Sequence, residues 1–292
     1  MPSRPYLNGA IPIADEWAKL VRRRPRTPHL IQDIQPDAPG EFTIIGGRTG
    51  VGKTNLQMQM GLSMATGTPF LGKRCEPVEV AMLAWEGPEE NVMERYMKAR
   101  EQFPSELRSN FHLQFLPQES RGAMLETVLE KLKKTPGCKV AILDSVKYIV
   151  EGDYLKSRDV VEFFETLKPT LRKFGMSANI ALPIKKPMNQ GWLIDVEDVY
   201  EVKGCTEWVD TATTVMLMEK RPRKHQEHVE IGIPKHRIAV NATQKMKLFF
   251  DKKRCMFVPE VGQCTQCGGS TDDDRDVVVE AAGKGVQIRT VV

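Results

Sequence analysis

Long apolar runs are missing from this 292-residue chain. No stretch approaches the ~20 consecutive apolar residues that a membrane-spanning helix needs. The first residues, Met1-Pro2-Ser3-Arg4-Pro5, also lack the apolar segment of a secretory signal peptide. We therefore expect a cytoplasmic protein without a membrane segment.

Cysteine is scarce, since only six cysteines are scattered along the chain. This usage suits a reducing compartment better than a disulfide-stapled secreted domain. One pair, Cys264 and Cys267, has half of the spacing of a zinc ribbon, which His225, His228 or Cys255 could complete. The alternative is two free thiols in a polar tail.

Charge of one sign is not in large excess, because 42 lysines and arginines face 38 acids and give a net charge of +4. Such a balance permits a nucleic-acid partner without requiring one. Hydrophobic residues make up 41% of the chain and charged residues 27%, which predicts a packed globular core.

What the chain does contain is a phosphate-loop pattern. The run Gly47-Arg48-Thr49-Gly50-Val51-Gly52-Lys53-Thr54 fits G-x-x-x-x-G-K-[ST], with strand-like residues before it and helix-like residues from Asn55 onward. Backbone N–H groups and the helix N-terminus would face phosphate oxygens there. We predict that the stretch from Gly47 to Asn55 binds ATP, that Lys53 reaches the β- and γ-phosphates, and that Thr54 ligates Mg²⁺. The alternative is a glycine-rich turn that binds nothing.

Strand-like and helix-like runs alternate after this loop. The expected strands are 78–85, 112–116, 139–144 and 177–184, and the expected helices are 88–102, 124–133 and 157–174. This alternation predicts an α/β fold whose mainly parallel twisted sheet is flanked by helices. Four closely spaced runs at 213–219, 228–234, 245–251 and 255–259 predict antiparallel C-terminal strands that extend the sheet.

Two acids follow predicted strands. Asp144 ends the apolar run 140–143, where an aspartate can hold the magnesium ion. It could instead merely end the strand and cap the next helix. Glu86 ends the run 80–85 and could polarise the attacking water as a general base. The alternative is an exposed side chain, and Glu89 better suits the first turn of a helix.

The order of these features resembles the RecA-like ATPase core, and in particular its RepA-like branch, which contains plasmid and phage replicative hexameric helicases. The resemblance is carried by the phosphate loop, by the entry segment 27–36 before Gly40, by Ala84-Trp85-Glu86-Gly87-Pro88-Glu89-Glu90 and by the strand that ends in Asp144. It implies three parts: a lead-in segment at 1–26, a RecA-like ATPase domain at 27–260, and a polar tail at 261–292 that we expect to be mobile.

The resemblance also implies a ring-forming homo-oligomer that acts on single-stranded DNA, and the family's pattern predicts a hexamer. In such motors a lysine and an arginine on a late hairpin reach the neighbour's active site. Lys235 and Arg237 match, and their spacing places both on one face of a strand. The alternative is a solvated basic edge that discourages strand pairing.

A loop at 185–204 follows the fourth strand, where RecA-like proteins contact DNA. The family commonly has a neutral polar sensor there, whereas this chain has lysines. The predicted nucleic-acid contacts are Lys185, Lys186, Asn189, Gln190, Trp192 and Lys203, joined by the basic residues Arg221, Arg223 and Lys224. An ordinary surface loop and a solvated hairpin tip are the alternatives.

Three functions remain open at this point. The first is a DNA-dependent ATPase motor, most concretely a ring-forming replicative helicase with replication or recombination partners. The second is a recombinase or single-strand annealing mediator built on the same core. The third is a nucleotide switch that acts on protein partners.

Overall fold

The computed structural model describes residues 28–116, 121–135, 137–184, 193–202, 206–221, 228–237 and 245–259. Within these ranges the predicted α/β fold is confirmed, because a nine-stranded sheet runs in the order β11-β10-β9-β8-β3-β7-β6-β4-β5. No helix in these ranges is both long and apolar enough to span a membrane.

Six strands of the sheet run parallel to one another. They are β3 (Phe42–Gly47), β4 (Val80–Ala84), β5 (Phe111–Phe115), β6 (Val140–Asp144), β7 (Ser177–Pro183) and β8 (Thr214–Arg221). Three antiparallel strands continue beyond β8, as the sequence predicts: β9 (His228–His236), β10 (Met246–Asp251) and β11 (Met256–Pro259). The parallel strands therefore share one carboxyl edge, and β9 runs back from it.

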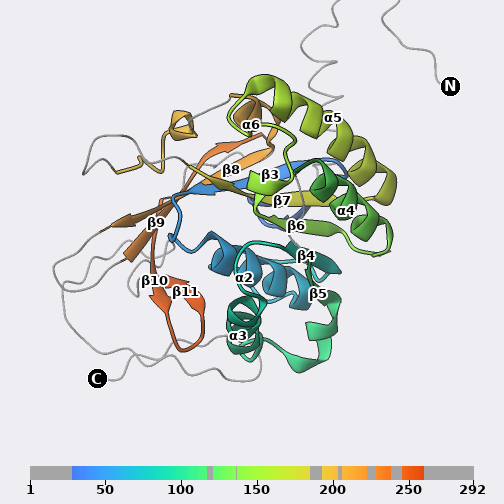
Figure 1. Cartoon of the computed structure of the whole chain (residues 1–292). Coiled ribbons are helices and arrows are strands. Elements are labelled where there is room, and N and C mark those ends of the chain that lie inside the picture. The colour runs from blue at the N-terminus through green and yellow to red at the C-terminus, as the bar shows by residue number, and fades with distance from the viewer. Residues whose placement is uncertain are drawn as a thin grey trace, which may run out of the picture.

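Helices cover both faces of the sheet (Figure 1). One face carries α2 (Lys53–Thr66) and α3 (Glu89–Arg100) together with the β10–β11 hairpin, and the other carries α4 (Arg121–Lys133), α5 (Ser157–Phe174) and α6 (Thr206–Thr211). Neighbouring side chains of β3 point to opposite faces of the sheet. Phe42 and Ile44 pack with α5 on one face, whereas Ile45 packs with α2 on the other. Because both faces are covered, the central strands are apolar throughout.

Three short elements were not expected from the sequence. Residues in the entry segment form a small antiparallel pair, β1 (His29–Ile31) and β2 (Gln35–Pro36), and α6 lies between the expected loop at 185–204 and the expected strand at 213–219. The indole of Trp208 in α6 is buried, packs against Phe163 and Phe164, and donates to the Tyr154 carbonyl at 2.8 Å. Tertiary contacts of this aromatic residue thus stabilise a helix too short to have a periodic signal.

Candidate nucleotide-binding site

The phosphate loop connects the carboxyl end of β3 to the start of α2. Gly50 and Gly52 have φ angles of 82° and 101°, which glycine adopts without the clash of a Cβ atom. Gly52 precedes the helix, and no side chain caps α2 there, so the first helical N–H groups stay available to an anion. A Cβ atom at Gly52 would lie 2.7 Å from the Phe257 ring, whereas one at Gly50 would meet open space. The loop is therefore closed on one side and open on the other.

Lys53 lies inside this loop. Its Nζ donates to the carbonyl oxygens of Gly47 at 2.9 Å and Arg48 at 3.0 Å. Burial lowers the pKa of Lys53, while the nearby carboxylates of Asp144 and Glu86 raise it. The amine thus faces two acids across the loop, in the position predicted for a contact to phosphate.

Asp144 and Thr54 are in direct contact. The Asp144 carboxyl is 4% exposed and accepts a hydrogen bond from the Thr54 side chain. Burial raises the pKa of Asp144 to about 6; the bond from Thr54 and the charge of Lys53 oppose this rise, and Glu86 adds to it. A buried carboxylate beside a hydroxyl fits Mg²⁺, which prefers oxygen ligands and keeps several waters. The two predicted metal ligands thus lie together.

Glu86 follows β4 next to this pair. It is exposed, and its Oε2 accepts a 2.6 Å hydrogen bond from Oγ of Ser145, the residue after Asp144. The Trp85 indole donates to the Ser145 carbonyl at 3.0 Å and so ties the two strand ends together. Ser145 was not predicted from the sequence, where a serine after a strand carries no distinctive signal.

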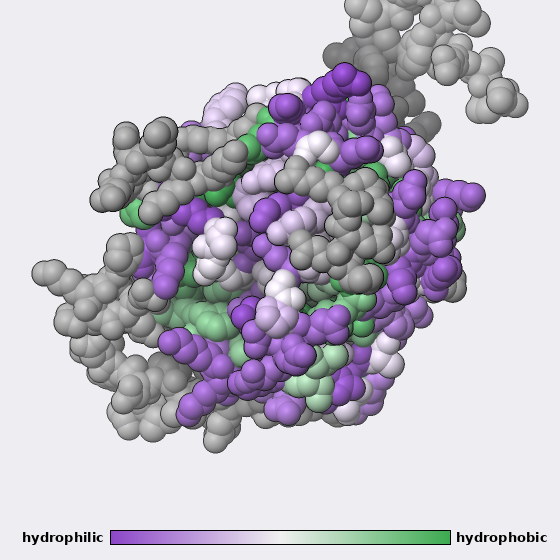
Figure 2. Space-filling view, viewed as in Figure 1, coloured by the Kyte–Doolittle hydropathy of each residue, from purple (hydrophilic) through white to green (hydrophobic). Residues whose placement is uncertain are grey.

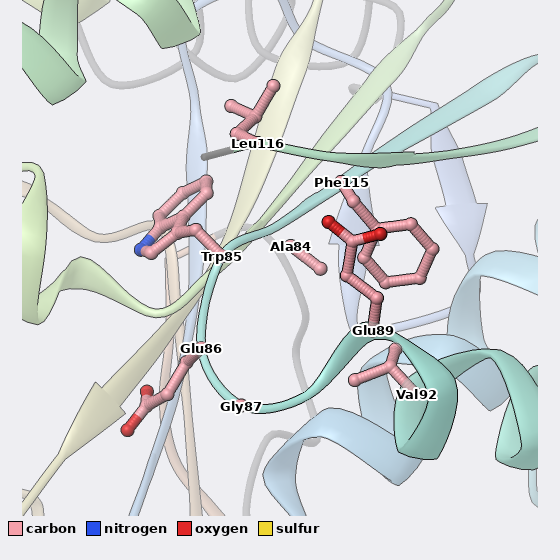
Figure 3. A pocket seen from close by; sticks show the side chains of 8 residues that line it. All are labelled: Ala84, Trp85, Glu86, Gly87, Glu89, Val92, Phe115 and Leu116. Atoms are coloured by element: carbon pink, nitrogen blue, oxygen red, sulfur yellow. The ribbon is translucent and has the colours of Figure 1, made fainter. Parts of the chain in front are cut away.

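A pocket of about 270 Å³ adjoins the loop after β4. It is lined by Ala84, Trp85, Glu86, Gly87, Glu89, Val92, Phe115 and Leu116. Figure 3 shows the carboxyl groups of Glu86 and Glu89 pointing to different sides of this loop, with Glu89 beside Phe115. Of these two acids, Glu86 is the one that accepts a hydrogen bond from Ser145. The geometry therefore favours Glu86 over Glu89 for chemistry at the phosphate loop.

Lys235 and Arg237 lie at the opposite edge of the sheet. Gly47 pairs with Met218 near the carboxyl end of β8, whereas His236 pairs with Thr214 at its start. Four residues of β8 separate these pairings, which is about 13 Å at the usual rise per strand residue. The Lys235 amine donates to the Val209 carbonyl and the Arg237 guanidinium to the Asp210 carbonyl, so both side chains reach α6. They do not join the phosphate loop of their own subunit.

Most predicted nucleic-acid contacts lie outside the described residues: Lys185, Lys186, Asn189, Gln190, Trp192, Lys203, Arg223 and Lys224. Arg221 is the exception. Its Nε lies 2.7 Å from Glu230 Oε2, and its Nη2 donates to the Ile194 carbonyl at 2.9 Å. This guanidinium is thus held by groups of the fold.

Cys264, Cys267 and His225 of the predicted zinc site also lie outside the described residues. Within them, Cys255 is a free thiol that donates to the Lys252 carbonyl. Glu79, His112 and Cys138 gather potential metal-ligand atoms within 4.8 Å of one another. They lie where β4, β5 and β6 begin, at the edge of the sheet opposite to Thr54 and Asp144.

The described surface is mainly hydrophilic in the view of Figure 2, with smaller hydrophobic areas near its centre.

No curated protein matches the sequence. By structure, the chain is similar to the ATPase domain of G40P, with a TM-score of 0.55, 14% identity, and coverage of 84% of this chain and 95% of that one. It is also similar to a DnaB-like replicative helicase that was solved in a study of its interactions with primase, with a TM-score of 0.56, 13% identity, and coverage of 85% and 67%.

At these identities the two structural likenesses concern the fold alone, which this chain shares with both proteins. A family model described as the AAA domain matches residues 11–181, which is more than half of the chain. The chain therefore belongs to the AAA domain family.

Proposed function

We propose that this protein is an ATP-hydrolysing, DNA-dependent motor, most specifically a ring-forming replicative DNA helicase of the RepA-like type. The observation that carries the proposal is the contact between Thr54 and Asp144 beside the Lys53 amine. This constellation lies at the carboxyl edge of a sheet whose fold is shared with helicase ATPase domains.

Each side chain of the site has a distinct task in this proposal. The N–H groups at the start of α2 and the Lys53 amine bind the β- and γ-phosphates. Mg²⁺ held by Thr54 and Asp144 would neutralise charge on those phosphates. Glu86 accepts a proton from the attacking water, and the 2.6 Å bond from Ser145 orients its carboxylate.

The position of the two cations supports the proposal of a ring. Lys235 and Arg237 lie about 13 Å along β8 from the loop of their own subunit, so any phosphate that they contact belongs to a neighbour. Such cations stabilise charge in the transition state of phosphoryl transfer. We therefore propose that each ATP site is completed by Arg237, with Lys235 beside it, from the adjacent subunit.

The direct test of the motor function is ATP turnover with and without single-stranded DNA, followed by strand displacement on a forked duplex. The proposal predicts turnover that rises with DNA and is lost in Lys53→Ala, together with displacement. Stimulation without displacement would instead support a recombinase or annealing protein. Turnover unaffected by DNA would overturn the motor and favour a nucleotide switch.

A mixing experiment tests the shared site. Glu86→Gln and Arg237→Ala are each expected to be nearly inactive alone, whereas mixed rings contain some interfaces with an intact Glu86 and an intact Arg237. Partial recovery of turnover is the expected result. Arg254→Ala, which removes an arginine paired with Asp251 on the β10–β11 hairpin, serves as the control. Absence of recovery at every mixing ratio would favour a basic sheet edge.

A further inference from the structure

Ile184 and Ile194, which flank the segment 185–192, are linked to the first two residues of the phosphate loop. On its N-terminal side, the backbone N–H of Ile184 donates to the Gly47 carbonyl at 3.1 Å. On its C-terminal side, the N–H of Ile194 donates to Oε2 of Glu219 at 3.0 Å. The same carboxylate oxygen lies 3.3 Å from Nε of Arg48. The phosphate loop is therefore linked directly to Ile184 and, through Glu219, to Ile194.

Glu219 is an unusual residue for its position. It lies in β8 after five buried residues, and its side chain is only 3% exposed. A buried carboxylate is costly unless it is paired and hydrogen-bonded. Arg48 provides the opposite charge and Ile194 provides an N–H donor. Loss of either partner would therefore leave the buried carboxylate of Glu219 more dependent on the other. Glu219 therefore contacts both the Arg48 guanidinium and the Ile194 backbone.

Ile194 is tightly packed, so its backbone has a well-defined position. Ile194 and Val196 are fully buried, and the Ile194 carbonyl accepts a 2.9 Å bond from Nη2 of Arg221. A Cβ atom at Gly232 would lie only 2.1 Å from the Val196 carbonyl oxygen, so the backbone rests directly on β9. A change in the hydrogen bond that Ile194 donates to Glu219 would thus act on a segment with little freedom to adjust locally.

We propose that Glu219 is a positioning residue that couples nucleotide binding to the anchor at Ile194. A triphosphate in the loop attracts the Arg48 guanidinium that Glu219 now holds, and this attraction alters the charge facing the Ile194 N–H. By linkage, a ligand that moves the anchor changes the affinity of the loop for nucleotide by the same factor. This inference deepens the proposed function and rests on it for the identity of that ligand, single-stranded DNA.

The decisive variant is Glu219→Gln, which retains an acceptor for Ile194 but removes the charge that pairs with Arg48. Glu162→Gln is the matched control, because Glu162 forms an ion pair with Arg158 within α5 and contacts neither Arg48 nor Ile194. The first readout is hydrogen exchange over residues 193–202 with and without a non-hydrolysable ATP analogue. The second is the change in kcat and KM for ATP caused by single-stranded DNA.

Wild type and Glu162→Gln should show altered exchange on nucleotide binding and stimulation by DNA. Glu219→Gln should still bind the analogue but lose both responses, with DNA stimulation reduced about fivefold or more. Arg48→Lys, which keeps the charge but not the Nε contact, should lose the exchange response as well; it serves if Glu219→Gln does not fold. A normal exchange response in these variants would overturn the coupling. An exchange response in wild type without any effect of DNA would refute the motor but retain the coupling.

Discussion

Replacing Asp144 with asparagine should stabilise the nucleotide-free protein while removing its response to magnesium. Burial raises the pKa of Asp144 from 3.8 to about 6. An acid whose pKa is higher in the folded than in the unfolded state destabilises the fold when it is charged. This cost is fully present above pH 6, declines as pH falls from 6 to 3.8, and is absent below the unfolded pKa of 3.8. At about 1.4 kcal/mol per pKa unit, this charge destabilises the fold by about 3 kcal/mol at pH 7.

Asparagine retains the shape of Asp144 and can still accept a bond from Thr54, so the variant should recover most of that free energy. The assay is urea unfolding at pH 7 in the presence of a chelator, followed by titration of a fluorescent ATP analogue with and without Mg²⁺. Asp198→Asn is the control, because Asp198 is exposed and caps the turn at Tyr200, where asparagine caps equally well. Lower stability of Asp144→Asn than of wild type would refute the reasoning on burial, and unchanged dependence on Mg²⁺ would refute the metal role.

Three further predictions concern the stability of the fold. Burial and the neighbouring His29 lower the pKa of His236 to about 4, so its contribution to stability is present above pH 6.5 and is lost as pH falls towards 4. Allowing for its partial exposure, His236→Asn should flatten the dependence of the urea midpoint on pH in this window by about 1 kcal/mol. Gln59→Leu should cost about 2 kcal/mol or more in urea unfolding, because the Gln59 amide satisfies both backbone groups of Phe257. Gly52→Ala should cost about 1–3 kcal/mol through its positive φ and should weaken nucleotide binding in titrations; wild-type affinity would contradict the close packing on Phe257.

The sequence predicted the parts of the molecule that depend on local patterns. The glycines, the lysine and the threonine of the phosphate loop have a spacing that few other loops need. The strand that ends in Asp144 is apolar until its last residue. Helix α5 was predicted with its observed bounds, Ser157–Phe174, because its apolar residues recur at helical spacing. Even the contact of Asp144 with Thr54 follows once the strands are parallel, since their carboxyl ends share an edge.

Features that depend on pairing between distant strands could not be predicted. The position of Arg237 relative to Gly47 requires the register of β8 with both β3 and β9. The ion pair of Arg48 with Glu219 needs the same information, and its only signal in the sequence is an acid that follows five apolar or small residues of β8. Single side chains that are brought together only by the pairing of distant strands leave no periodic pattern in the sequence.

The most direct test of the central claim is ATP turnover by the purified protein with Mg²⁺ and single-stranded DNA, in wild type and in Lys53→Ala. The account predicts turnover in wild type that requires Mg²⁺, rises with DNA, and is abolished when the Lys53 amine is removed. Equal turnover in the two proteins would contradict it, because hydrolysis would then take place somewhere other than the loop between β3 and α2.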